Sequence, residues 1–435
     1  MIALHTHAVL ALALTCAHAV AASSSAGDMP THVILAEASA ARNIVTDTAA
    51  TASTDAADAA TAWALGDWGG ARTALAVHGL DLEFVATTDI LGVVDGGIRR
   101  GVEALSKFDL VFKLDTGTAG WWRNGSLQVV LLGTAGGSLS ERAGDMQIVS
   151  NIEAPANTLI VYEANYEHHF LDDRVALLVG LHDLNADFYV LEHAGLFLNS
   201  SFGIGIEVAQ VGASLFPVTA PGARLQIKMT PNTYLQAGVF DGVPGVPGDP
   251  ARPHGTHITF DRGDGIFSIA EIGWLGEAVS YYKLALGSWY HSREFIDINN
   301  RTRANNDGIY LIGEKDLWRT EDGCGVGVFA QLGFTEGDRN QVSTSVAGGV
   351  NWTGPLPARP QDVAGLAVAH ARNGERFRRL NPGGERAETT LEMSYLMQPA
   401  PWLTVQPDLQ YVIHPSTDTS LDNALVLGVR LQVAF

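Results

Sequence analysis

The chain alternates apolar and polar residues with a period of two along most of its length after residue 80. The pattern is clearest at the end, where alternate positions are wholly apolar: Leu425, Leu427, Val429, Leu431, Val433 and Phe435. The positions between them hold small or polar residues, including Arg430 and Gln432. Because successive side chains of a strand point to opposite faces, the pattern predicts a strand with one apolar and one polar face.

The same alternation predicts about sixteen strands in all. They cover residues 80–90, 107–117, 126–134, 158–170, 174–182, 222–229, 233–241, 265–274, 279–290, 307–317, 323–334, 341–353, 361–370, 390–398, 403–413 and 425–435. Their lengths are close to the roughly 9–11 residues with which a tilted strand crosses a bilayer, and single-chain bacterial barrels have an even strand number.

The connections between these strands alternate in length. Short ones lie at 171–173, 230–232, 275–278, 318–322 and 399–401, and longer ones at 135–157, 183–221, 242–264, 291–306, 371–385 and 414–423. Barrels of the outer membrane have short periplasmic turns and long external loops. We therefore predict an all-β fold, a sixteen-stranded antiparallel transmembrane β-barrel over residues 80–435, with both ends of the barrel segment at the periplasmic side. Residues 202–216 also alternate, but counting them as a strand would break this order, so we assign them to the 183–221 loop.

A sheet in hydrocarbon must close, because each unpaired backbone group there costs several kcal/mol. Aromatic rings are favoured at the two membrane interfaces. We expect them there near the strand ends, at Trp121, Trp122, Trp274, Trp289, Trp318, Trp352, Trp402 and Tyr411.

The chain before the strands divides into three parts. Residues 1–21 read as a cleaved signal peptide, with the apolar segment AVLALALT at 8–15 followed by A-x-A sites. Residues 22–62, rich in Ala, Ser, Thr and Asp, predict a low-complexity periplasmic extension. Residues 63–79 predict a short periplasmic helix that ends at Gly79.

Charge and cysteine content exclude some classes of function. A net charge of −20 argues against a nucleic-acid partner, because phosphate binding requires clustered Lys and Arg. Cys16 and Cys324 are the two cysteines, and Cys16 lies in the signal segment, so no internal disulfide is expected. We also expect neither a metal nor a cofactor: His168 and His169 are adjacent on a strand, so their side chains face opposite sides.

Several segments, taken together and in order, resemble the carbohydrate-selective outer-membrane porin family. They are GDWGGAR (66–72), GDMQIVSNIEAP (144–155), GLHDLNADFY (180–189), FLNSSFG (197–203), RPQDVAGLAVAHA (359–371), QPDLQYVIHP (406–415) and NALVLGVRLQVAF (423–435). The resemblance implies a sixteen-stranded barrel whose loops fold inward to narrow the pore. It also implies passage of monosaccharides and similar polyols.

Selectivity in such a pore depends on the polar groups that replace part of a solute's hydration shell. We expect these groups on the two loops that coincide with matched segments: Arg142, Asp145, Asn151, Glu153, Asp183, Asn185, Asp187, Glu192, His193 and Asn199. The alternative is that they only tie the loops to the inner wall. The period-two pattern adds wall residues that face the lumen: Glu163, Glu167, Glu392, Gln406, Asp408, Gln410, Arg430 and Gln432.

These observations lead to one functional hypothesis and two alternatives. The hypothesis is an outer-membrane porin of a Gram-negative-type bacterium, through which small neutral sugars diffuse passively. The alternatives are a general, unselective porin and an exported enzyme acting on glycans or lipids. Five arginines in residues 372–386 suggest contact with outer-membrane lipid or lipopolysaccharide, or else a solvated cluster. The pattern leaves open whether the barrel is a monomer or a homotrimer.

Overall fold

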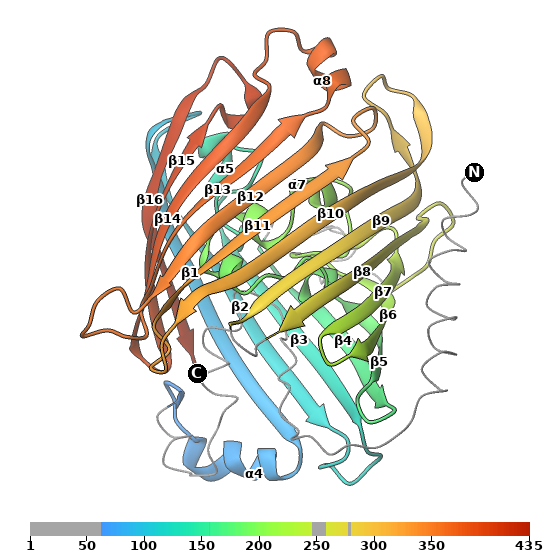
Figure 1. Cartoon of the computed structure of the whole chain (residues 1–435), viewed down its shortest axis with the longest axis vertical. Helices are drawn as coiled ribbons and strands as arrows, with labels where there is room; N and C mark the ends of the chain where they lie inside the picture. The colour runs from blue at the N-terminus through green and yellow to red at the C-terminus, as the bar shows by residue number, and fades with distance from the viewer. Residues whose placement is uncertain (1–61, 156, 246–257, 277–279) are drawn as a thin grey trace.

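The computed structural model describes residues 62–155, 157–245, 258–276 and 280–435. The predicted signal peptide and almost all of the predicted N-terminal extension lie outside these ranges. The described strands form one closed antiparallel barrel (Figure 1). They are β1 (Leu80–Gly97), β2 (Gly101–Asp115), β3 (Gly125–Gly136), β4 (Thr158–Phe170), β5 (Val175–His182), β6 (Ala220–Thr230), β7 (Thr233–Asp241), β8 (Ile266–Gly276), β9 (Tyr282–Ile296), β10 (Thr302–Arg319), β11 (Gly325–Thr335), β12 (Val342–Thr353), β13 (Val363–Asn373), β14 (Ala387–Ala400), β15 (Leu403–Ile413) and β16 (Asp422–Ala434).

Each strand pairs with its neighbours in the chain, and β16 closes the ring on β1 with Arg430 opposite Asp89. The predicted sixteen-stranded barrel is therefore confirmed, strand for strand. Because the barrel is closed, none of its strands has a free edge. The backbone N–H and C=O groups can then pair between neighbouring strands, since hydrocarbon offers them no hydrogen-bond partner. In the part of the chain that the structure describes, no helix is long and apolar enough to span a membrane.

The two faces of the barrel differ as the alternation predicts. Leu427 on β16 is 40% exposed on the outside, while its neighbour Val426 is fully buried inside. Met393 on β14 likewise lies outside, between the buried Glu392 and Ser394. One strand departs from strict alternation: β4 has a bulge at Tyr162, so Tyr162 and Glu163 are both buried. Such a bulge shifts every later inward position by one residue.

The prediction was wrong for Trp289. The other predicted interfacial tryptophans are exposed or half-buried, but Trp289 is 3% exposed and stacks on Phe267. Its position in β9 has the same parity as the inward Ala285 and Gly287, so the indole belongs to the interior. An aromatic residue near a strand end indicates an interface only if its parity also points outward.

Several strands run further than predicted, among them β1, β2, β9 and β10. The alternation in β9 and β10 ends near Tyr290 and Asp307, yet the hairpin pairing continues to Ile296 and Thr302. The added residues include Arg293, Glu294 and Arg303. The alternation of apolar residues ends where the strands enter polar surroundings. Hydrogen bonding between the two backbones continues there, because it does not require apolar side chains.

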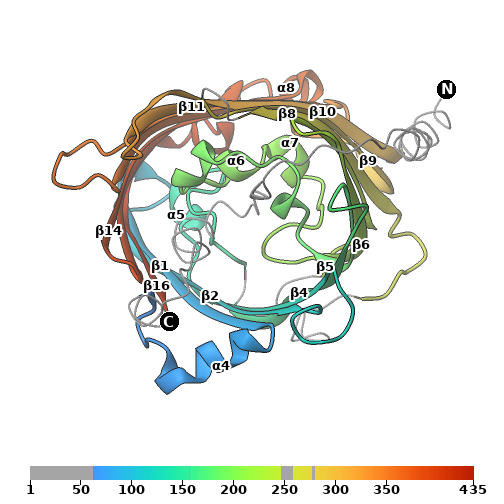
Figure 2. The ribbon, with the colours of Figure 1, turned by 60° about the horizontal axis from the view of Figure 1, so that its bottom comes forward.

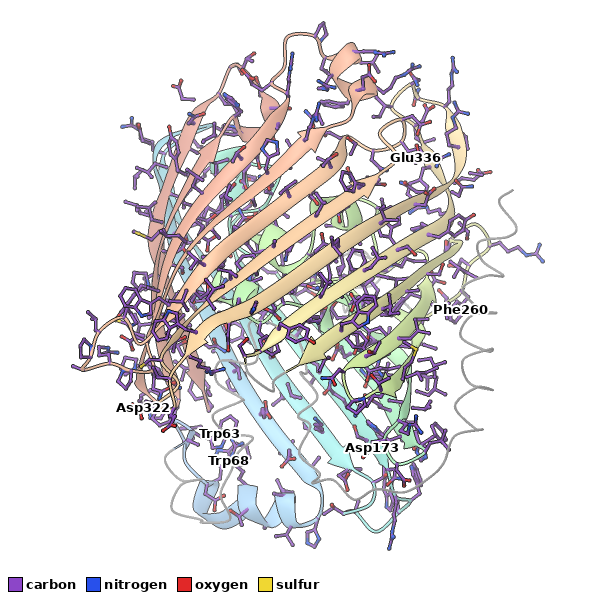
Figure 3. The ribbon with its side chains drawn as sticks, in the orientation of Figure 1. Trp63, Trp68, Asp173, Phe260, Asp322 and Glu336 are labelled. Carbon is purple, nitrogen blue, oxygen red and sulfur yellow. The ribbon has the colours of Figure 1, made fainter. Side chains whose placement is uncertain are left out.

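The short turns share one end of the barrel with the C-terminus, and Figure 3 shows Asp173 and Asp322 at that end and Glu336 toward the other. Here a 3-10 turn, η1 (Trp68–Gly70), leads into α4 (Ala71–Val77), within the predicted helical segment. The Arg72 guanidinium lies between the rings of Trp63 and Trp68, at 4.0 and 4.4 Å. It also donates to the carbonyl oxygens of Leu82 and Phe435, at 2.5 and 2.7 Å. The GDWGGAR segment thus attaches α4 to the first strand of the barrel and to the residue that follows the last strand.

Candidate functional site

The longest described loop between consecutive strands folds into the barrel. It follows the last residue of β5, His182, and contains η2 (Leu184–Ala186), η3 (His193–Leu196), α6 (Ser200–Gly203) and α7 (Ile206–Ala209). Figure 2 shows α6 and α7 inside the ring of strands. Phe197 and Phe202 pack on Phe329 of β11, at centroid distances of 5.7 and 6.0 Å. The assignment of residues 202–216 to a loop is confirmed, because the barrel continues from β5 directly to β6 and this segment contains α7 and the end of α6 instead of a barrel strand.

Glycines on the inner wall make room for this loop. A Cβ on Gly327 would lie 2.1 Å from the His193 ring, and one on Gly333 would lie 2.0 Å from the Glu207 carboxylate. A Cβ on Gly365 would lie 2.4 Å from Leu196. The loop can therefore pack closely against the wall because these positions of β11 and β13 are glycines, which have no side chain.

Buried carboxylates of the wall accept backbone N–H groups of the same loop. Glu271 on β8 accepts from Tyr189 N at 3.2 Å, and also from the hydroxyls of Tyr234 and Tyr310. Glu314 on β10 accepts from His193 N at 2.9 Å. Glu392 on β14 accepts from Leu198 N and Asn199 N, at 2.5 and 3.0 Å. These carboxylates hold the loop by its main chain along half the circumference.

The loop between β3 and β4, which contains α5 (Ser140–Ala143), also folds inward. Glu388 on β14 accepts from Met146 N and Gln147 N, at 2.9 and 3.0 Å. The Ser150 hydroxyl donates to Asp89 on β1 at 2.7 Å. Asn151 accepts from Arg430 on β16 at 2.7 Å. This second loop is thus fixed where the sheet closes.

The two inward loops bind each other as well. Asn151 N donates to Leu198 O at 2.7 Å, and Ser200 N donates to Ile148 O at 3.0 Å. The family resemblance implies that both loops fold inward, but it does not imply that they contact each other. Together they form one surface inside the barrel, which we call the loop junction: residues 146–151 and 198–200.

A charged network holds the start of the longer loop. Asp187 accepts from Arg224 on β6 at 3.0 Å and contacts His182 on β5 at 2.6 Å. Arg224 also contacts Glu167 on β4 at 3.4 Å. Burial favours the neutral form of Asp187, but Arg224 and His182 outweigh it and hold the pKa of its carboxyl well below the ordinary range.

Two other loop carboxyls behave in the opposite way. Burial raises the pKa of Glu207 to about 7, although Ser345 and Tyr189 donate hydroxyl hydrogen bonds to it. Burial, with the charge of Glu153 nearby, raises the pKa of Asp145 to about 6. Neither carboxyl forms an ion pair with a described residue, so burial sets the direction in which its pKa shifts.

The structure shows how the predicted loop residues are held. Arg142 binds Glu103 on β2 at 2.6 Å, and Glu153 accepts from Leu139 N and Ser140 N within its own loop. Asn185 donates to Phe188 O and Gly203 O, and the fully buried Asn199 contacts Gln410. These residues tie the loops to themselves or to the wall. Solute contact stays a prediction for the members with exposed surface, which include Asn151, Asp183, Asp187 and Glu192.

The predicted wall residues are on the inner face, and several of them bind the loops. Gln406 donates to Leu196 O at 2.5 Å, and Gln410 donates to Val149 O at 2.8 Å. Glu163 accepts from Gln128 at 2.6 Å. The prediction missed Glu271, Glu314 and Glu388, although their strand parity would have placed them in the lumen.

A family model described as "Carbohydrate-selective porin, OprB family" matches residues 99–435. The chain belongs to the carbohydrate-selective porin family. It is an outer-membrane channel protein, as the resemblance of its sequence segments implies.

Individual relatives of this porin are distant. It is 23% identical to Porin B of Pseudomonas aeruginosa over 420 residues, covering 86% of this chain and 91% of that protein. It is 20% identical to the putative porin QuiX of Acinetobacter baylyi, covering 86% and 93%. The high-pH structure of Pseudomonas putida OprB aligns with a TM-score of 0.78 at 21% identity, covering 87% of this chain and 99% of that one. The low-pH structure of the same protein has a TM-score of 0.58 at 19% identity.

Proposed function

We propose that this porin lets small neutral carbohydrates, such as monosaccharides and polyols, diffuse passively through a water-filled lumen that its two inward loops narrow. The observation that carries the proposal is the anchoring of both loops to the inner wall, by Glu271, Glu314, Glu388 and Glu392. A loop fixed at this many points presents its polar groups to a solute at constant positions.

Uncharged solutes suit such a lumen. Hydroxyl groups exchange hydrogen bonds with water for hydrogen bonds with amide and carboxylate groups at little net cost. The loop junction and the adjoining network offer an amide at Asn151, a hydroxyl at Ser200 and a carboxylate at Asp187. The relative named Porin B and the family description support carbohydrate as the solute class.

Planar-bilayer conductance of the purified protein, with and without glucose, tests this proposal. We expect ion channels whose current glucose interrupts in a concentration-dependent way. Liposome swelling with neutral sugars and with charged solutes of equal size separates a selective porin from a general one. Equal swelling rates would refute selectivity, and absence of any channel would refute the proposal as a whole.

The family and the barrel favour a channel over an exported enzyme. An enzyme acting on glycans or lipids would need a convergent acid, base or nucleophile set. Hydrolysis of such a substrate by the purified protein, abolished by replacing one lumen carboxylate, would overturn this part of the proposal.

We also propose that lipopolysaccharide contacts the arginines around α8 (Glu375–Leu380), which lies at the end of the barrel opposite the short turns (Figure 1). Arg376 donates to Asn299 in the neighbouring β9–β10 connection at 2.8 Å, which joins the two segments at the rim. Arginine recognises phosphate by paired hydrogen bonds. Replacing Arg378 and Arg379 by Gln should lower the amount of co-purified lipopolysaccharide, and an unchanged amount would refute the contact.

A further inference from the structure

Ile148 has an unusual backbone at the centre of the loop junction. Its φ is 55°, in the left-handed region that a β-branched residue adopts only under strain. Among the described non-glycine residues with positive φ, the other β-branched one is Thr417, which is buried and accepts a hydrogen bond from Asn373 at 2.8 Å. Ile148 has no polar side-chain atom that could stabilise such a turn.

The residues on either side hold Ile148 in this conformation. Gln147 N donates to Glu388, and Val149 O accepts from Gln410. The carbonyl of Ile148 itself accepts from Ser200 of the other loop. A strained residue persists where its surroundings fix it, and such residues concentrate at ligand contacts.

The side chain of Ile148 gains little from packing in return. It is 41% exposed, whereas Gln147 and Val149 beside it are buried. Gln147 and Val149 bind the inner faces of β14 and β15, so the exposed side of this segment faces the lumen. One exposed isoleucine needs no explanation by itself. An exposed isoleucine with a strained backbone does need an explanation, because Gly or Asn at this position would avoid the strain.

We propose that Ile148 is an apolar contact for the C–H face of a pyranose ring at the loop junction. Asn151 and Ser200, which are half-buried beside it, can then meet the ring's hydroxyl groups. An open-chain polyol has no rigid C–H face to place on the isoleucine. The contact therefore makes the pore favour cyclic sugars over polyols of equal carbon number, a specificity that rests on the proposed carbohydrate function.

Bilayer recordings with glucose and with sorbitol test this contact. In the unmodified channel, glucose should interrupt the current at lower concentration than sorbitol. Ile148→Asn and Ile148→Gly should weaken glucose binding about three- to fivefold, the effect of losing part of one apolar side chain, and leave sorbitol unchanged. Ile148→Leu, which keeps an apolar group, should retain glucose binding.

A matched control separates strain from solute contact. Leu171 also has a φ of 55° and is 61% exposed, but it lies in the β4–β5 turn, outside the lumen. Both Ile148→Asn and Leu171→Asn should raise the urea midpoint of unfolding, and Leu171→Asn should leave glucose binding unchanged.

The possible failures are distinct. Unchanged glucose binding in Ile148→Asn would overturn the proposed contact and leave the carbohydrate function intact. A lower urea midpoint in that variant would also overturn it, because Ile148 would then be retained for packing. An unmodified channel that conducts ions but binds and passes no sugar would refute the proposed function itself, and this contact with it.

Discussion

Arg430 on the last strand donates two hydrogen bonds to Asp89 on the first strand, at 2.7 and 2.8 Å. Both side chains are buried, and the same guanidinium binds Asn151 while the same carboxylate binds Ser150. The pair therefore joins the closure of the sheet to the anchoring of an inward loop.

We expect Arg430→Gln to lower the free energy of unfolding by about 3–5 kcal/mol, because Asp89 is left as an unpaired buried charge. Urea unfolding of the refolded protein measures this. The double variant Asp89→Asn with Arg430→Gln removes both charges and should recover most of the loss. Equal stability of the single variant and the unmodified protein would contradict the prediction.

Glu271→Gln should loosen the longer loop. The carboxylate of Glu271 accepts from Tyr234, Tyr310, Tyr189 N and Gln236, so an amide would turn a donor toward other donors. The expected loss is about 1.5–3 kcal/mol for a hydrogen bond to a charged group, together with higher open-channel current and weaker glucose block. Glu321→Gln in an exposed turn is the control. A stable variant with unaltered current would show that Glu271 does not fix the loop.

The loop should be better anchored at acidic pH through Glu207. The pKa of this carboxyl is about 7 in the folded chain against an ordinary 4.5, so the folded state holds the proton more tightly than the unfolded state. Its contribution to stability is complete below pH 4.5 and is lost as the pH rises through 7, by about 3 kcal/mol in total. Glu207→Gln should remove this dependence. Urea midpoints measured at intervals from pH 4 to 8 give the comparison, and parallel curves for the two proteins would exclude Glu207 as the cause.

Adding one methyl group to the wall should also displace the loop. The Cβ of Gly333→Ala would meet the Glu207 carboxylate, which is buried and held by hydrogen bonds from Tyr189 and Ser345. Such overpacking costs about 1–3 kcal/mol, and we expect a lower urea midpoint with altered channel current. Gly383→Ala, whose Cβ would have open space around it, should change neither. Identical behaviour of the two variants would mean that the wall tolerates a side chain at position 333.

The sequence predicted the strands and their order because the membrane imposes a simple rule on them. Leu427 and Val426 are both apolar, yet the run of alternate positions assigned one to lipid and the other to the interior. The rule failed where other forces act. Trp289 is an inward aromatic that packs inside the lumen, and the β9–β10 hairpin extends beyond the apolar zone.

The interior was harder to predict, since no periodicity governs a loop. The matched segments pointed to the two loops, but Arg224, which binds Asp187, and Gln410, which binds Asn199, lie 37 and 211 residues away in the sequence. Glu271 and Glu314 could have been found by parity alone. Their function as acceptors of loop N–H groups could not, because backbone donors leave no mark in a sequence.

The anchoring of the loop through its backbone N–H groups also bears on how such a channel can change the solute that it admits. A main-chain N–H is the same in every residue except proline, so Glu314 and Glu392 hold the loop whatever side chains it turns toward the water. Descendants of one ancestral gene can exchange those side chains by point mutation while the scaffold stays as it was. The anchoring of the loop is therefore independent of the side chains that a solute meets.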